Sequence, residues 1–180
     1  GSHREVLLGC ETPAQYTQQA AFLGATVGRY ANRIAQSRYS HDGLTVHLHP
    51  SQGEHQLHGG LEGFDKRRWT IIQQTARQVV YQLASPDGDQ GFPGNLNATA
   101  TYSVTDDNRI SVVFRATVDK PCPVNLTNHA YFNLDGKQGD IRQHRLQILA
   151  DAWLPVDSNG IPAGNLAPVQ RTGFDFRGAK

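Results

Sequence analysis

The sequence predicts an all-β fold, an antiparallel β-sandwich with long loops between its strands. Short runs of β-branched or alternating residues recur along the chain, at 45–49, 79–83, 98–104, 110–118 and 145–149. Clusters of Asp, Asn, Gly, Pro and Ser separate these runs, as is typical of turns. Helix signals are weak, and 18 glycines and 9 prolines are spread along the chain.

The first element that we expect is a short helix near the start of the chain. Thr12 provides a hydroxyl that can cap a helix, and Pro13 suits its first turn. The pattern predicts that this helix ends near Gln19.

The two longest β-runs, 98–104 and 110–118, predict a β-hairpin. The residues Thr105-Asp106-Asp107-Asn108 between them favour a turn. Apolar residues alternate with polar ones in the second run, although Val113 breaks the pattern. This alternation is typical of a strand with one buried face.

Composition limits the classes of function. The chain has 180 residues, is 38% hydrophobic and 18% charged, and carries a net charge of +1. It therefore suits a single domain over residues 1–180 and gives no electrostatic case for nucleic acid or an anionic membrane. Cys10 and Cys122 form no CxxC motif, which fits a reducing compartment such as the cytoplasm. Because the chain contains no methionine, not even at position 1, we expect it to begin after processing, after a tag remnant or inside a longer protein.

The strongest candidate for chemistry is His129, in the run PCPVNLTNHAYFNLDG at 121–136. Neutral hydrogen-bonding side chains surround this histidine, which suits a polyol ligand more than phosphate or a metal. His129 has the strand parity of Asn125 and Thr127, opposite to Val124 and Leu126, so we expect it on a polar face. An imidazole there can exchange a proton with a sugar oxygen near neutral pH, although a histidine satisfying a turn is the competing interpretation.

Two further segments also carry side chains that can form hydrogen bonds with a sugar. Asn32 and Arg33 can together clasp neighbouring hydroxyl groups with several hydrogen-bond donors, or Arg33 can form a surface ion pair. His58 precedes Gly59-Gly60, which allows the backbone to approach a ligand closely, or it is simply a turn histidine.

A metal site is the main competing hypothesis. His47 and His49 are two residues apart in a predicted strand, so their side chains share a face, and Glu54 follows as a third ligand. This arrangement resembles half of a cupin metal motif, but no later segment matches the other half.

Five segments together resemble the aldose 1-epimerase (galactose mutarotase) family. They are FLGATVGRYANRIA, QLHGGLEGFDKRRW, SPDGDQGFPGNL, PVNLTNHAYFNLDG and LPVDSNGIPAG, and they follow one another in the order found in the family. They cover most of the chain from Phe22 onward.

The resemblance implies a large antiparallel β-sandwich and an enzyme that interconverts the α and β anomers of aldoses such as D-galactose and D-glucose. It implies no metal and no organic cofactor. By similarity, His129 is the general acid that protonates the ring oxygen. Residues at family positions that bind or flank the sugar are Asn32, Arg33, His58, Ala130 and Tyr131.

The chain departs from the family pattern at the catalytic base. That base is a glutamate near the C-terminal end of a longer chain, so we expect it outside these 180 residues, as we do the family's earliest strands. Asp157 and Asp175 follow His129 but lie outside the base motif, and Glu62 matches a structural stretch. Two alternatives stay open: a non-catalytic carbohydrate-binding module, and an epimerase relative acting on hexose phosphates through the basic triplet 66–68.

Overall fold

The computed structural model describes residues 4–136 and 139–180. The chain divides into two compact units. One is Gly9–Tyr131; the other combines Gly1–Leu8 with Phe132–Lys180. The expectation of one domain over residues 1–180 stays a prediction.

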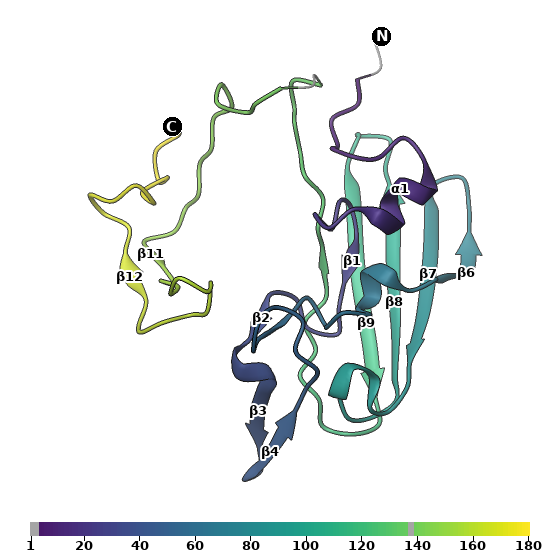
Figure 1. The fold of residues 1–180 in the computed structure, drawn as a ribbon. Coiled ribbons are helices and arrows are strands. Elements are labelled where there is room, and N and C mark those ends of the chain that lie inside the picture. Colours follow the sequence, from purple (N-terminus) through teal and green to yellow (C-terminus); the bar gives the residue numbers. More distant parts are fainter. Residues whose placement is uncertain (1–3, 137–138) are drawn as a thin grey trace. The chain divides into compact units, whose positions relative to one another are not determined.

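A four-stranded antiparallel sheet dominates the larger unit, in the order β6-β7-β8-β9 (Figure 1). Its strands are β6 (Thr70–Gln74), β7 (Gln78–Ser85), β8 (Leu96–Val104) and β9 (Ile110–Val118). Strands β8 and β9 pair in register from Leu96↔Val118 to Val104↔Ile110. The predicted hairpin is therefore confirmed, and its turn closes with a hydrogen bond from the Asn108 N–H to the Thr105 carbonyl at 3.1 Å.

One face of this sheet forms the core of the larger unit. Leu83, Leu96 and Ala98 are buried there against Phe64, with Trp69, Val118 and Leu126 packed around them. Phe64 comes from the 3₁₀ turn η2 (Phe64–Lys66). Strand β9 shows the predicted alternation, but the inward side chains of Val112, Phe114 and Val118 are only half-buried and Ala116 is exposed.

The helix α1 (Pro13–Gln18) confirms the expected short N-terminal helix. Thr12 and Gln15 form a reciprocal capping box that satisfies backbone N–H groups at its start. The three short ladders of the larger unit are β1 (Thr26–Val27) with β10 (Thr127–Asn128), β2 (Arg33–Ile34) with β5 (Gln56–Leu57), and β3 (Arg38–His41) with β4 (Leu44–His47). The predicted run 45–49 thus ends earlier, at His47. Two more 3₁₀ turns are η1 (Ala35–Ser37) and η3 (Asp89–Gly91).

In the smaller unit, β11 (Ala152–Trp153) pairs with β12 (Ala167–Pro168). The predicted strand at 145–149 is wrong, since the structure has no strand there; Leu146 and Lys180 exchange two backbone hydrogen bonds, and Ile148 donates one to Phe176. Leu146, Ile148 and Leu149 are all exposed, so the alternating side chains of this run do not pack against a neighbouring strand.

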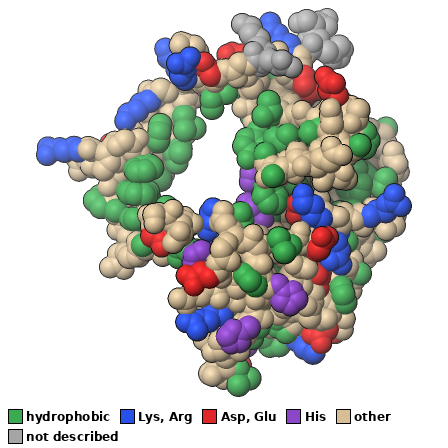
Figure 2. All heavy atoms as spheres, viewed as in Figure 1, with side chains coloured by type: hydrophobic (Ala, Val, Ile, Leu, Met, Phe, Trp, Pro, Cys, Tyr) green, Lys and Arg blue, Asp and Glu red, His purple; other side chains and the backbone are tan. Residues whose placement is uncertain are grey.

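Charged side chains do not gather into one large patch on the visible surface. Figure 2 shows acidic and basic side chains interspersed on that face, which agrees with the net charge of +1. Within the described residues, the structure contains no helix long and apolar enough to cross a membrane.

Candidate active site

His129 lies at the end of the β1–β10 ladder, where its N–H and its carbonyl both bond to the segment that precedes β1. Its N–H donates to the Ala25 carbonyl at 2.9 Å, and its carbonyl accepts from the Gly24 N–H at 3.1 Å. The preceding Asn128 side chain donates to the Tyr102 hydroxyl of the large sheet at 3.2 Å. Successive strand residues point to opposite sides, so the His129 imidazole lies on the side away from Asn128.

The strand parity expected around His129 is met in part. Leu126 packs against the core, as predicted. Val124, which shares its parity, lines a hollow together with Leu126, Phe114 and Ala116, but it is 38% exposed.

His58 and Asn32 hold one another through a reciprocal pair of hydrogen bonds. The His58 N–H donates to the Asn32 carbonyl at 2.9 Å, and the Asn32 N–H donates to Nδ1 of His58 at 3.0 Å. Both residues adopt a positive φ, 65° at Asn32 and 52° at His58, a conformation that non-glycine residues adopt at a cost. Because Nδ1 accepts, the proton of the neutral ring resides on Nε2, which is left as a donor for a ligand.

The two imidazoles meet in an aromatic cluster of Phe22, His58, His129 and Tyr131. The His58 and His129 ring centroids are 5.2 Å apart, with planes at 89°. Phe22 contacts both rings, with centroid distances of 4.6 Å to His58 and 5.7 Å to His129. The ring centroids of Tyr131 and His129 are 5.1 Å apart. Phe22 and His58, 36 residues apart in the chain, and His58 and His129, 71 residues apart, are thus brought together.

Burial and charge keep His58 neutral. Its pKa is lowered to about 4, first because the ring is partly removed from water and then because His129 and Arg33 lie nearby. At neutral pH, His58 therefore acts as a neutral hydrogen-bond donor, not as a cation.

Arg33 is oriented by two side-chain contacts. Its Nε donates to Gln52 Oε1 at 2.7 Å, and its Nη1 donates to Asn32 Oδ1 at 3.3 Å. In the part of the chain that the structure describes, its Nη2 has no hydrogen-bond partner. A guanidinium fixed in this way can present donors to adjacent hydroxyl groups.

The two residues after His129 border the same cluster. The Ala130 N–H donates to Asn128 Oδ1 at 3.1 Å, which tightens the chain as it leaves β10. Ala130 is half-buried, and Tyr131 is 41% exposed. All six residues expected at the site, Asn32, Arg33, His58, His129, Ala130 and Tyr131, belong to the larger unit.

Two members of the site escaped the sequence-based assignment. Phe22 lies within the first matching segment, but a single aromatic residue after a polar stretch does not indicate contact with two histidines. Gln52 lies in a loop and orients Arg33 from 19 residues away. No local pattern signals such a contact.

Within the larger unit, Gly9–Tyr131, carboxylates do not complete the cluster, because none of them forms an ion pair or hydrogen bond with His58 or His129. Asp175, in the smaller unit, is bonded to Arg177 at 2.9 and 2.8 Å, and mainly these bonds lower its pKa to about 2. Such a carboxylate is a weak base.

The metal-binding alternative is not met by the structure. Among residues 4–136 and 139–180, no group of three or more His, Cys, Asp or Glu side chains is placed to hold a metal ion. His47, His49 and Glu54 therefore do not converge.

The basic triplet is also partly neutralised. Lys66 Nζ lies 3.3 Å from Asp65, and Arg67 Nη1 lies 3.1 Å from Asp89. These ion pairs weaken the case for a phosphate pocket at 66–68.

Comparison with known proteins matches the whole chain to one family. The family model described as Aldose 1-epimerase matches residues 1–180. Aldose 1-epimerase of Escherichia coli (strain K12) is 68% identical over 180 residues, 100% of this chain and 52% of that protein. Galactose mutarotase of Rattus norvegicus is 45% identical over 178 residues, with 98% and 52% of the two chains covered. The chain thus spans about half the length of the curated relatives it matches.

Solved structures agree with this result. The aldose epimerase homologue from C. elegans superimposes with a TM-score of 0.91 at 39% identity, covering 97% of this chain and 53% of that one. Galactose 1-epimerase from Lactobacillus acidophilus NCFM gives a TM-score of 0.89 at 34% identity, covering 98% and 53%. The all-β expectation is confirmed, and the chain belongs to the aldose 1-epimerase family.

Proposed function

We propose that the protein containing this chain is an aldose 1-epimerase and that this chain supplies the acid half of its active site. The observation that carries the proposal is the perpendicular pair of His58 and His129, 5.2 Å apart between ring centroids. Its substrates are aldohexoses such as D-galactose and D-glucose, and it requires neither a metal nor an organic cofactor. The two free cysteines fit the reducing conditions of the cytoplasm.

His129 is the general acid in this proposal. A base removes the proton from the C1 hydroxyl, the bond between C1 and the ring oxygen breaks, and His129 donates its proton to that oxygen. The open-chain aldehyde rotates about C1–C2. The same proton transfers run in reverse on the other face of the carbonyl and yield the other anomer. Proton donation of this kind contributes about 100- to 10,000-fold in rate.

His58 and Arg33 hold the sugar in this proposal. Because the pKa of His58 is lowered to about 4, we assign the catalytic proton to His129 and a neutral Nε2–H donor to His58. Arg33 cannot serve as an acid because its guanidinium stays charged. With Asn32, it instead orients the hydroxyl groups.

The base is a carboxylate in this proposal, the glutamate that the family resemblance implies. No carboxylate of the larger unit, Gly9–Tyr131, forms an ion pair or hydrogen bond with either imidazole. We therefore propose that the base comes from the half of the relatives' length that this chain does not span.

Polarimetry with an added base tests the proposal. Freshly dissolved α-D-galactose is followed by optical rotation with the chain, with its His129→Ala variant and with no protein, in each case with and without added formate. A small carboxylate can replace the missing base, so we expect the chain to accelerate mutarotation beyond formate alone and His129→Ala not to.

Two results would contradict this assignment. Equal rates for the chain and its His129→Ala variant in formate would remove His129 as the acid. If galactose binds but no rate enhancement appears at any formate concentration, the chain is a carbohydrate-binding module instead.

A further inference from the structure

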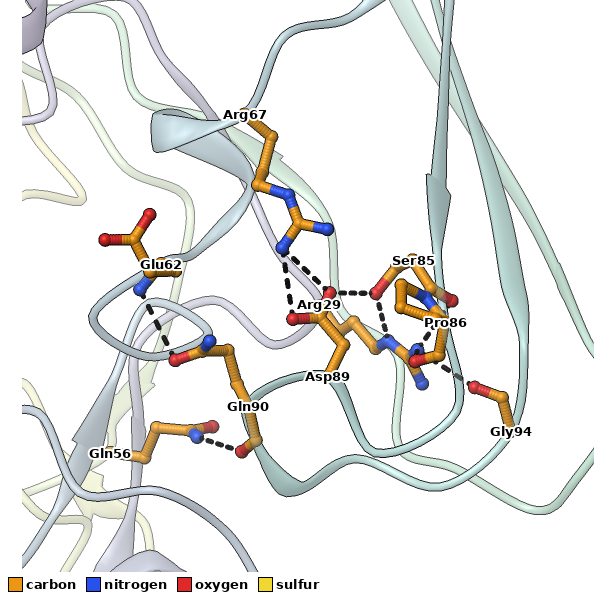
Figure 3. Close-up of polar contacts among 9 residues, drawn as sticks. All are labelled: Arg29, Gln56, Glu62, Arg67, Ser85, Pro86, Asp89, Gln90 and Gly94. Carbon is orange, nitrogen blue, oxygen red and sulfur yellow. Dashed lines mark hydrogen bonds and ion pairs between the residues drawn. The ribbon is translucent and has the colours of Figure 1, made fainter.

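The segment 85–94, which joins β7 to β8, contacts both segments that carry the proposed sugar-binding residues (Figure 3). One contact reaches Arg29, three residues before Asn32. The other reaches the turn that carries His58. The backbone of this segment is unusual, with positive φ at Gly88, Gln90, Gly91 and Gly94.

The first contact is the guanidinium of Arg29, a side chain that is 1% exposed. Its nitrogens donate to four backbone carbonyls at 2.8–2.9 Å, those of Ser85, Pro86, Pro93 and Gly94. Its Nε also donates to the Ser85 hydroxyl at 2.9 Å. A buried charge is tolerated only when it is fully hydrogen-bonded, and this one draws both ends of the segment together.

Asp89 supplies the opposite charge. The Ser85 hydroxyl donates to Asp89 Oδ2, so a single hydroxyl links Arg29 to this carboxylate. Arg67 Nη1 donates to both Asp89 oxygens, at 3.1 and 3.2 Å. The carboxylate side chain is 8% exposed, and Figure 3 shows it between the two arginines.

The second contact is made by Gln90. Its carbonyl accepts from the Gln56 side chain at 3.0 Å and from the His49 N–H at 3.0 Å. Its side-chain oxygen accepts from the Glu62 N–H at 3.3 Å. Gln56 and Glu62 flank the turn that carries His58, and Gln90 therefore holds that turn from both ends.

Two glycines in this turn make the contact close. A Cβ atom added to Gly60 would lie 2.4 Å from Gln90 Oε1, and one added to Gly59 would lie 1.8 Å from the Gly28 carbonyl oxygen. The turn therefore packs directly against Gln90 on one side and against the backbone before Arg29 on the other.

We propose that residues 85–94 form a positioning clamp for the sugar site and that the side chain of Gln90 is its positioning residue for His58. Arg29 anchors the clamp to the Asn32–Arg33 segment, and Gln90 anchors it to the His58 turn. The catalytic consequence rests on the proposed function, but the positioning of His58 can be measured without a sugar.

The test compares three substitutions at Gln90 in the 180-residue chain. Gln90→Glu keeps an acceptor for the Glu62 N–H, Gln90→Met keeps the volume without the acceptor, and Gln90→Ala removes both. Asp106→Asn, in the exposed β8–β9 turn, is the matched control. The ¹⁵N NMR signal of His58 Nδ1 reports whether this nitrogen still accepts from Asn32, and a D-galactose titration gives the Kd.

We expect Gln90→Ala and Gln90→Met to move the His58 Nδ1 signal toward that of a ring without this hydrogen bond. We expect them to raise the Kd about tenfold, the scale of one lost hydrogen bond. Gln90→Glu and Asp106→Asn should change neither quantity. An unchanged Nδ1 signal in Gln90→Met, or the same displacement in Gln90→Glu, would overturn the clamp. If the unmodified chain binds no galactose, the proposed function fails, and the Nδ1 signal still decides the positioning role.

Discussion

The clamp and the aromatic cluster both contain polar side chains, but these differ in their access to water. In the clamp, Arg29 is 1% exposed and Asp89 is 8% exposed, and both are fully hydrogen-bonded. In the cluster, the rings of His58 and His129 are half-buried, and Tyr131 is 41% exposed.

The difference shows that polar and charged side chains serve two purposes within the larger unit. Charge that is fully paired in the interior fixes the geometry of the backbone but cannot act on a ligand. A proton donor must keep a face open to its substrate, and its pKa then depends on how much water remains around it. In this proposal the clamp determines where the His58 imidazole lies, and the surroundings of the two rings in the cluster determine what they can do.

Breaking the clamp should produce the largest loss of stability. Arg29→Ala leaves four backbone carbonyls, two of them in buried and two in part-buried contacts, without their donor and Asp89 without part of its compensation. We therefore expect the free energy of unfolding to fall by about 3–5 kcal/mol. Arg115→Ala, at an exposed position of β9, should change it by about 0.5 kcal/mol or less. Urea unfolding followed by fluorescence gives both values. Equal stability of the two variants would contradict the structural role of Arg29.

Protonation of His58 in the cluster should lower the free energy of unfolding by a smaller amount, and only at acidic pH. The pKa of His58 is about 4 in the folded chain and 6.5 for an unperturbed histidine. Between these values the unfolded chain binds more protons, so stability should fall as the pH decreases from 6.5 to 4. We expect a loss of roughly 1–2 kcal/mol after allowance for solvent screening.

Urea unfolding at several pH values measures this slope. His58→Gln should flatten it between pH 6.5 and 4, whereas His41→Gln, at an exposed position of β3, should leave it unchanged. A slope that persists in His58→Gln would show that another group titrates.

Local signals were sufficient to predict part of the fold. The β8–β9 hairpin and α1 follow from alternation, turn residues and a capping threonine, all within a few residues of one another. The run 145–149 has a similar alternation but no strand beside it, and a strand forms only where a neighbour completes its hydrogen bonds.

The candidate site could not be predicted from local signals, because its residues come from segments that are far apart in the sequence. Periodicity does not show that Phe22, His58 and His129 meet, and the resemblance to the family was needed to group the two histidines. The structural role of Arg29 was not predicted because its partners are mainly backbone carbonyls, which every residue carries. Gln90 escaped notice for the same reason, since it acts on the backbone of Glu62 and through its own carbonyl.

NMR spectroscopy of the histidine side chains during a D-galactose titration tests the central claim most directly. If His58 and His129 form the sugar site, their imidazole signals should shift together and saturate at one Kd. The signals of His41 and His47, both exposed on the β3–β4 ladder, should not move. Saturable shifts confined to other histidines, or none at His58 and His129 at saturating galactose, would contradict the account.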